Sequence, residues 1–498
     1  MLNKYVKKVL CWGMMISLIL TFPGKADITL YALDSAEELD EEIDEELDEE
    51  FDEEVDEELD EELDEELDEK NNVEESEDET DGENEEESTL DNEKQESNKT
   101  EKVTAKKSKY TYVLSDGNTT SLQYALDHGG NRIRLKGVFK LTETLWLPKR
   151  SNVTVDATGA YFYHNCAILS GKSKGFKWVG GTFEADNTRR IGFTLLHMQN
   201  ATFKNMTFIK ACPFGKHVFD LLGCNGITID NVTFKGYGNS TNYSKMNVHD
   251  RYAETIQLDT AFFESSGYNR LTDKQRRNTI KKGYLSYGDK FDGKPTKNVK
   301  VTNCTFTSIS NSKGKIISWA QTPLGQHNYA YKDCMKNIRF TNNTVINPIP
   351  IKKIKEDRYN GAVHFVCTKN LNISNNVFKI TDSRAKREVW IQVANDTNGV
   401  NDYSKNENLT AENIVIANNT FLGTAPTKAL ISLDSTHFQA PRYILKNITV
   451  KNNKYVSKSG KTPKNFIRLL GFKAQYKFKS KTNNKGMKLT KYNKLKKK

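Results

Sequence analysis

Short runs of alternating apolar and polar residues recur after residue 110, and they share one register. Each run has an apolar-x-apolar core, an Asn or its equivalent, and a second short segment ending in an aromatic or β-branched residue. Period-two alternation is typical of β-strands with one buried face. Most spacings, about 25–45 residues, fit one coil of a β-solenoid plus its loops. The nine runs are 152–162, 175–183, 200–208, 225–234, 298–306, 337–345, 370–378, 413–421 and 447–455.

Asparagines recur between the two halves of these runs, where the chain must bend sharply. Asn tolerates left-handed backbone angles, and amides stacked in successive coils can bond to one another. An antiparallel β-sandwich is the alternative, but it does not require the same register nine times. We therefore expect a parallel solenoid that bends at Asn205, Asn231, Asn303, Asn342, Asn375, Asn418 and Asn452.

A second series of short strands lies between the Asn-bearing runs, for example ETIQLDTA (254–261), KIISWAQ (315–321) and VWIQVAND (389–396). Alternation places Ile256 and Leu258 inward, and the same alternation divides the residues of the other strands into inward-facing and outward-facing ones. Outward residues of a parallel solenoid stack about 4.8 Å apart, so they should form one exposed stripe. Polar groups with an interposed Trp suit sugar binding. The stripe is expected to contain Asp220, Gln257, Asp259, His364, Trp390, Gln392, Ser432 and Asp434.

The N-terminal segment 1–26 has the pattern of a secretory signal peptide. Lys4, Lys7 and Lys8 precede an apolar stretch from Val9 to Phe22, and small residues follow. A membrane anchor is the alternative, but about 14 apolar residues fall short of the ~20 that span a bilayer. We expect no transmembrane segment after signal removal and a protein that is secreted, with association to the cell surface as a further option.

Charge is strongly segregated along the chain. Residues 33–100 form an acidic low-complexity region built on EELD-like units, and 34–100 contain 39 Asp and Glu. Such density of like charge predicts a disordered arm. From residue 101 onward, 66 Lys and Arg oppose 26 Asp and Glu, so the difference is +40. This predicts polyanionic partners for the 101–475 domain and the basic tail 476–498.

Six cysteines lie beyond the signal segment, and none forms a CxxC pair. Their scatter disfavours zinc and redox motifs, and several lie in apolar runs. We interpret them as small core residues rather than bridges. They are Cys166, Cys212, Cys224, Cys304, Cys334 and Cys367.

The repeat resembles the pectate lyase superfamily, which includes polysaccharide lyases, polygalacturonases and phage-type depolymerases. SDGNTTSLQYALDHGG (115–130) is similar to the cap helix that begins these proteins, and the resemblance covers about 110–475. It implies an all-β fold, a right-handed single-stranded parallel β-helix. The aspartate pairs of polygalacturonases and the arginine signature of the best-known pectate lyases are not found. The reaction is therefore left open.

In relatives with this coil order, a His at a strand entry, an E-x-I-Q-x-D strand and a later His cluster together. The resemblance implies catalytic roles for His217, Glu254, Asp259 and His327. The longest loops flank ETIQLDTA, and long loops on a rigid scaffold usually carry function. Expected substrate-binding residues are Gln257, His249, Lys315, His364, Trp390 and Gln392.

Two classes of function fit this pattern. The first is an enzyme, a lyase or a glycoside hydrolase, that cleaves an anionic polysaccharide. A lyase would use a His base, with Ca²⁺ held by Asp220 and Asp259, while a hydrolase would use Glu254 and Asp259. The alternative is a non-catalytic adhesin that binds a cell-envelope polymer through its basic charge. Nucleic acid is a weaker candidate because no recognised nucleic-acid-binding motif accompanies the basic charge. We expect a monomer.

Overall fold

A computed structural model describes residues 109–480, apart from 172, 187–189, 213–214, 239–252, 262–293, 327–333, 351–360, 386, 395–409, 425–428, 436–444, 458–465 and 471–475. Contacts divide the chain into residues 1–102 and 103–498, and every described residue belongs to the second unit. The predicted signal peptide and acidic arm lie outside the described residues, as do residues 481–498 of the predicted basic tail.

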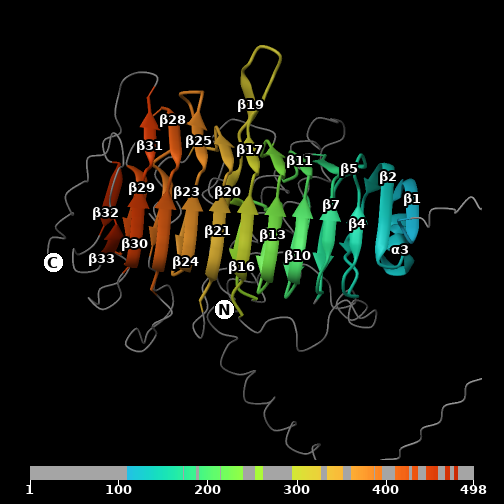
Figure 1. Cartoon of the computed structure of the whole chain (residues 1–498). Helices are drawn as coiled ribbons and strands as arrows, with labels where there is room; N and C mark the ends of the chain where they lie inside the picture. Colours follow the sequence, from blue (N-terminus) through green and yellow to red (C-terminus); the bar gives the residue numbers. More distant parts are fainter. Residues whose placement is uncertain are drawn as a thin grey trace, which may run out of the picture. The chain divides into compact units, whose positions relative to one another are not determined.

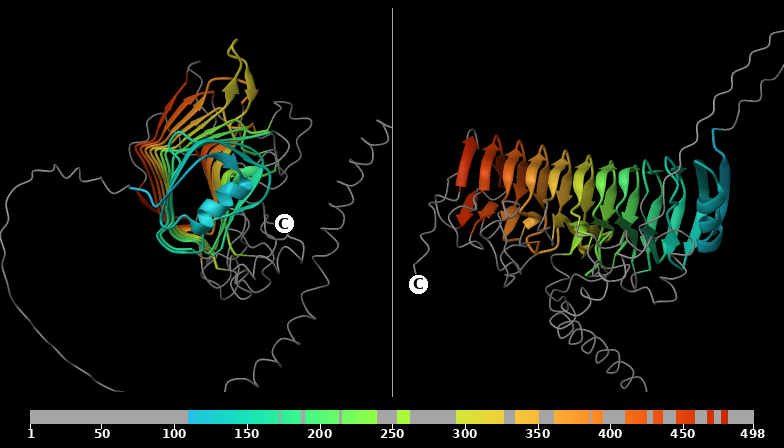
Figure 2. Two further views of the ribbon diagram at one scale, coloured as in Figure 1. Left: turned by 90° about the vertical axis from the view of Figure 1, so that its right-hand side faces the viewer. Right: turned by 90° about the horizontal axis from the view of Figure 1, so that it is seen from below.

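The described part is a right-handed parallel β-helix, which confirms the predicted fold class. Each regular coil contributes two strands to a 21-stranded sheet, here called sheet A, and one strand to a 10-stranded sheet, called sheet B. Successive coils stack in parallel from the blue end to the red end in Figure 1, and the end-on view in Figure 2 shows the interior that they enclose.

Sheet A begins with β1 (Tyr112–Asn118) and β2 (Arg132–Leu141). The first strands of its coils are β4 (Thr154–Asp156), β7 (Lys177–Val179), β10 (Gln199–Lys204), β13 (Asn225–Asp230), β16 (Lys297–Thr302), β21 (Lys336–Thr341), β24 (Lys369–Ser374), β27 (Glu412–Ala417), β30 (Leu445–Lys451) and β33 (Tyr476–Ser480). The second strands are β5 (Tyr161–His164), β8 (Thr182–Ala185), β11 (Thr207–Ile209), β14 (Thr233–Lys235), β17 (Thr305–Thr307), β22 (Thr344–Ile346), β25 (Val377–Ile380), β28 (Thr420–Gly423) and β31 (Lys454–Val456). Strand β33 pairs with β30, so the solenoid continues into the segment predicted as a tail.

Sheet B carries the third strand of each coil. Its strands are β3 (Leu145–Trp146), β6 (Cys166–Ser170), β9 (Ile191–Leu196), β12 (Phe219–Leu222), β15 (Glu254–Asp259), β20 (Thr322–Gln326), β23 (Gly361–Val366), β26 (Val389–Ala394), β29 (Ala429–Asp434) and β32 (Ile467–Leu470). A separate antiparallel hairpin is formed by β18 (Ile309–Ser310) and β19 (Ile316–Ser318).

The bends between the two strands of sheet A are built from asparagine, as predicted. All seven expected asparagines adopt a left-handed φ of 52–59°. In the later coils the residue that follows each bend is a second, buried asparagine: Asn343, Asn376, Asn419 or Asn453. The backbone N–H of Asn376 donates to Asn419 Oδ1 at 3.0 Å, and Asn376 Nδ2 donates to the Phe340 carbonyl at 2.9 Å. These amides thus satisfy backbone groups of the neighbouring coils.

Aromatic rings fill the interior beside these bends. Phe162, Phe183, Phe208, Phe234 and Phe306 stack from coil to coil, with ring centroids 4.5 to 5.4 Å apart. Stacked rings bury a large apolar area and add a preference for fixed geometry. The stack therefore holds the successive coils in one register.

Helix α3 (Thr119–His128) covers the N-terminal end of the solenoid (Figure 2). Asn118 and Ser121 form a reciprocal capping box at its start. Leu122, Ala125 and Leu126 are fully buried and close the core. This confirms the cap helix implied by the resemblance. No helix among the described residues is both long and apolar enough to cross a bilayer.

All six cysteines are free and buried, so their interpretation as core residues is confirmed. Burial raises the pKa of the Cys166, Cys212, Cys224 and Cys304 thiols to about 12. These thiols stay protonated at neutral pH and are poor nucleophiles.

We expect Asn376→Ala to destabilise the solenoid, because it leaves the Asn343 N–H and the Phe340 carbonyl without the amide that satisfies them. A buried group left unsatisfied costs about 1–3 kcal/mol, so the free energy of unfolding should fall by that amount in denaturant titrations. Asn372→Ala, on a half-buried outward position of the same coil, is the control and should change it by less than about 0.5 kcal/mol. Equal losses in the two variants would contradict a structural role for the amide ladder.

Acid sensitivity should depend partly on Asp156. Burial alone would raise its pKa, but hydrogen bonds from Tyr110, Thr158 and Arg134 lower the pKa of this carboxyl to about 2. An ordinary Asp has a pKa of about 3.9 in an unfolded chain. The ionised carboxylate therefore contributes full stability above pH ~4, and the contribution is lost as the pH falls toward ~2. Asp156→Asn should lose less stability than the wild type between these pH values in thermal melts. A steeper loss in the variant would contradict this assignment.

Candidate functional site on sheet B

Residues far apart in sequence meet on the outer face of sheet B, as the predicted stacking requires. Asp220 pairs with Gln257, Gln257 with Gly325, and His364 with Gln392 in adjacent strands. The predicted juxtaposition of Asp220, Gln257, His364, Gln392 and Ser432 in one row is therefore confirmed.

The expectation that this row is exposed is wrong. His364 has no exposed surface, Asp220, Asp259 and Gln392 keep at most 2 %, and Gln257 keeps 7 %. Every residue of β15, β23, β26 and β29 is buried. Alternation distinguishes the two faces of a strand, but it cannot tell whether other parts of the chain cover the outer one. The site is thus a buried polar layer and not an open groove.

The predicted outward position of Trp390 is also wrong. Its ring centroid lies 5.3 Å from that of Phe378, and the side chain belongs to the hydrophobic core together with Ile391. Two consecutive residues therefore face inward where the chain enters sheet B. The same holds for Val218 and Phe219, and for Leu430 and Ile431. The two-residue period restarts at this corner, and Trp390 is unavailable to stack on a sugar.

Glu254 is the centre of a cluster of titratable groups from three places in the chain. Its carboxylate is fully buried and forms an ion pair with His364 Nε2. The other carboxylate oxygen, Oε2, lies 3.6 Å from His217 Nδ1. His217 precedes β12, Glu254 begins β15, and His364 lies in the middle of β23. The structure thus brings together two predicted catalytic residues, His217 and Glu254, and one predicted substrate-binding residue, His364.

Hydrogen bonds to carbonyl groups define the protonation of both rings. His217 Nδ1 lies 2.7 Å from the Glu254 carbonyl oxygen, and His364 Nδ1 lies 3.2 Å from that of Gly361. A carbonyl oxygen only accepts, so each Nδ1 carries a proton. The neutral form of His217 therefore has its lone pair on Nε2. The pair of His364 Nε2 with Glu254 is an ion pair when both ring nitrogens of His364 are protonated.

Gly325 makes room for the Glu254–His364 pair. It lies on β20, the strand between β15 and β23, and a Cβ atom there would overlap His364 Nε2 and Glu254 Oε1. Sequence reasoning missed this residue because it assigned the sheet B strand to KIISWAQ. The actual strand, TPLGQ at 322–326, contains Pro and Gly, which are poor strand formers.

Two arginines beside the cluster were also missed. Arg387 is fully buried, and its Nη2 donates to the Gly361 carbonyl at 3.1 Å, the carbonyl that accepts from His364. Arg190 Nε and the His217 carbonyl oxygen lie 2.8 and 3.1 Å from the point where a Gly192 side chain would begin. Arg190 Nε therefore lies near the main chain of His217. Arg387, two residues before the start of the VWIQVAND strand, could have been noticed as a charge at the edge of an apolar run.

The predicted acidic residues have structural partners. Asp259 accepts hydrogen bonds from Gln257 Nε2 at 3.2 Å and from the Thr260 N–H at 2.8 Å. Asp220, on β12, pairs with Gln257 of the adjacent strand β15. Among the described residues, no three His, Cys, Asp or Glu side chains converge as a metal site would require. Ca²⁺ takes six to eight oxygen ligands, so Asp220 and Asp259 do not by themselves fit the predicted ion.

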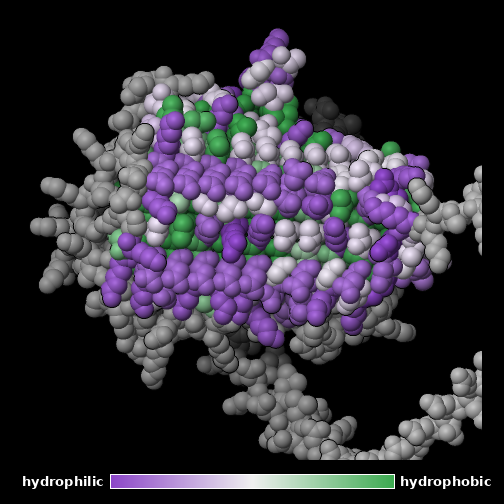
Figure 3. Space-filling model, viewed as in Figure 1, coloured by the Kyte–Doolittle hydropathy of each residue, from purple (hydrophilic) through white to green (hydrophobic). Residues whose placement is uncertain are grey.

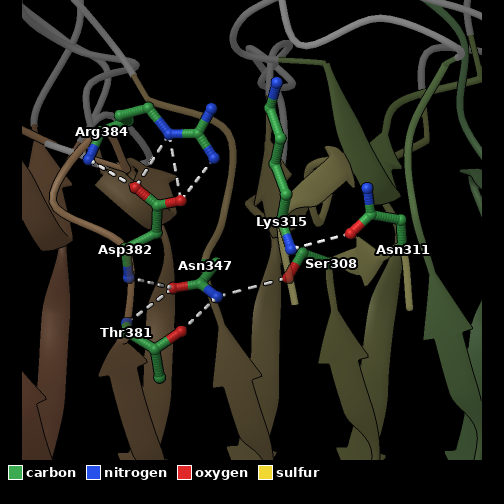
Figure 4. A network of polar contacts seen from close by, with 7 residues as sticks. All are labelled: Ser308, Asn311, Lys315, Asn347, Thr381, Asp382 and Arg384. Atoms are coloured by element: carbon green, nitrogen blue, oxygen red, sulfur yellow. Dashed lines mark hydrogen bonds and ion pairs between the residues drawn. The ribbon is translucent and has the colours of Figure 1, made fainter. Parts of the chain in front are cut away.

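Lys315 lies away from the strands of sheet B. It directly precedes β19 in the β18–β19 hairpin, and its N–H donates to Asn311 Oδ1 at 3.0 Å (Figure 4). The nearby Asn347 amide bonds Ser308 and Thr381, while Arg384 pairs with Asp382. The structure therefore does not bring Lys315 to the Glu254 cluster. His249 and His327 lie outside the described residues.

No protein-family model matches this sequence, and no curated protein matches it either. Solved structures with a similar fold include PfbA, a surface adhesin of Streptococcus pneumoniae, with 18 % identity, 74 % of this chain and 84 % of that chain covered, and a TM-score of 0.48. An exopolygalacturonase from Thermotoga maritima shares 11 % identity, over 73 % and 82 % of the two chains, with a TM-score of 0.41. An alginate lyase from Paenibacillus sp. also shares 11 %, over 74 % and 99 %, with a TM-score of 0.33. These similarities concern the fold alone.

We expect Gly325→Ala to disrupt the Glu254–His364 pair, because the added methyl group occupies their contact. Breaking a buried ion pair costs about 3–5 kcal/mol, which denaturant titration would measure as a lower free energy of unfolding. In a His364→Ala background the same change should cost much less, since the ring is already absent. Additive effects in this double-mutant cycle would contradict the assigned role of Gly325.

Proposed function

We propose that this chain is a secreted polysaccharide lyase that acts on a uronate-containing glycan. The observation that carries the proposal is the arrangement of His217, whose Nδ1 is held by the Glu254 carbonyl while the Glu254 carboxylate lies 3.6 Å away. This leaves Nε2 to accept a proton and provides a negative charge to stabilise the imidazolium that forms. The same logic operates in catalytic triads.

The reaction we infer is β-elimination. His217 Nε2 would take the proton α to the uronate carboxylate, the C–H electrons would form a C=C bond, and the glycosidic C–O bond would break. The leaving oxygen takes a proton from water. Charge develops on the uronate carboxylate, and a nearby cation lowers the barrier by neutralising it. Arg190, whose Nε lies near the main chain of His217, is our candidate for that role.

Glu254 and His364 are better suited to positioning than to contact with substrate. The Glu254 side chain is completely buried between two imidazoles, whereas 10 % of the His217 side chain remains exposed. A hydrolase would need Glu254 or Asp259 to reach the glycosidic oxygen. Asp259 is already bonded to Gln257 and Thr260. This arrangement favours the lyase over the hydrolase.

Polygalacturonate and alginate, incubated separately with the full chain, test the proposal through absorbance of the unsaturated product near 235 nm. We expect turnover by the wild type and a loss of about 10²–10⁴ in kcat for His217→Gln. His128→Gln, an exposed His on α3, is the matched control and should leave kcat unchanged.

Glu254→Gln should lower kcat and shift the acidic limb of the kcat/KM profile to lower pH, because the imidazolium loses a neighbouring negative charge. A purely structural role would leave the pH profile in place. New reducing ends without 235-nm absorbance would overturn the lyase in favour of a hydrolase. Salt-sensitive binding without any cleavage would favour the adhesin.

A further inference from the structure

A second polar surface lies on sheet A, separate from the Glu254 cluster. The outer face of β16, β21, β24 and β27 is hollowed into a groove of about 530 Å³. Figure 3 shows this face, with polar rows running across the strands and a less polar strip between them. The groove is lined by Asn298, Val299, Lys300, Asn337, Arg339, Asn370, Leu371, Asn372, Asn413 and Val415.

One wall of the groove is an exposed ladder of amides. Asn337 Nδ2 donates to Asn298 Oδ1 at 2.6 Å, and Asn370 Nδ2 donates to Asn337 Oδ1 at 2.8 Å. Asn413 Nδ2 in turn donates to Asn370 Oδ1 at 2.8 Å. Each amide has two N–H donors and uses one within the ladder, so a second donor per coil is directed elsewhere. All four residues are exposed and have a left-handed φ of 55–61°.

The other wall carries positive charge and no negative charge. Lys300 and Arg339 are exposed and directly paired on β16 and β21, and Asn372 and Val415 continue the row. None of the ten lining residues is acidic. Among the described residues, Asn372 Oδ1 is a buried acceptor with no hydrogen-bond partner. The half-buried Asn372 amide lines the groove, and Val415 offers an apolar contact.

We propose that this groove binds an extended uronic-acid polysaccharide aligned with the solenoid axis, at a site that performs no chemistry. Lys300 and Arg339 would bind carboxylates, and the amide ladder would donate to ring and hydroxyl oxygens. Four strands span three inter-strand steps, about 14 Å, so several sugar units are contacted at once. The carboxylates of such a glycan would bind the two cations, and its hydroxyls would bind the amide wall. A simple anion would not use the amide wall.

The occupant could instead be the acidic EELD segment at 37–69, which shares the carboxylates but lacks the hydroxyls. The glycan is the better match, because two cations beside four amides fit one carboxylate per sugar unit better than three carboxylates in every four residues. Binding here does not depend on the lyase proposal, since the groove lies on sheet A and His217 precedes a strand of sheet B.

The test measures binding of a fluorescently labelled oligogalacturonate of about six units to the full chain by anisotropy. We expect Lys300→Gln/Arg339→Gln to weaken the Kd at least tenfold and to reduce its dependence on salt. Lys451→Gln/Lys454→Gln, exposed cations on sheet A outside the groove, is the matched control and should change the Kd less than twofold.

Asn337→Gly tests the amide wall, because Gly keeps the left-handed bend and removes only the side chain. It should weaken binding about three- to tenfold, with an unchanged melting temperature as the check on folding.

Equal losses in the two double variants would mean non-specific attraction and overturn the proposal. A synthetic 37–69 peptide that binds through Lys300 and Arg339 while the oligogalacturonate does not would overturn it in favour of the acidic arm. Loss of binding with 235-nm cleavage of short substrates retained would separate this site from the lyase site.

Discussion

The left-handed asparagine bend is the constraint on which the rest of this molecule depends. A β-helix must turn at the same point in every coil, or its strands lose register and every outward side chain moves to the wrong face. Asn205 and its equivalents adopt the required φ at little cost, and in the later coils the buried asparagine that follows each bend satisfies backbone groups of adjacent coils. The amides thus set both the direction and the spacing of the coils.

This register brings chemistry from distant segments into contact. Glu254 and His364 are more than one hundred positions apart, yet one intervening strand separates them, and Gly325 leaves that strand without a side chain at the point of contact. The same register produces two polar layers of different character. The layer on sheet B is buried and contains both signs of charge, whereas the groove on sheet A is open and carries only positive charge.

Much of the fold could be predicted from the sequence, because the Asn bends and the aromatic positions repeat at a fixed register. The buried thiols followed from local apolar patterns, and the cap helix was implied by the family resemblance. The errors have identifiable causes. Trp390 was misplaced because the two-residue strand period restarts where the chain enters sheet B. Strand β20 was missed because it contains Pro323 and Gly325, which are poor strand formers. The burial of the outer face of sheet B could not be foreseen, since alternation distinguishes the two faces of a strand and does not report whether the outer face is exposed. His217 and Glu254 were found through family resemblance, whereas Arg190 gave no local signal.

The absence of disulfides among the six buried cysteines of the described part has a consequence for how the solenoid reaches its native state. Their thiols are packed inside the coils, and those of Cys166, Cys212, Cys224 and Cys304 are protonated at neutral pH. No covalent cross-link has to form before the coils can stack, so maturation is independent of thiol oxidants and disulfide isomerases. The same architecture can therefore assemble in reducing and in oxidising surroundings. Hydrogen-bonded amides connect its coils, whereas small exported domains are held together by disulfides.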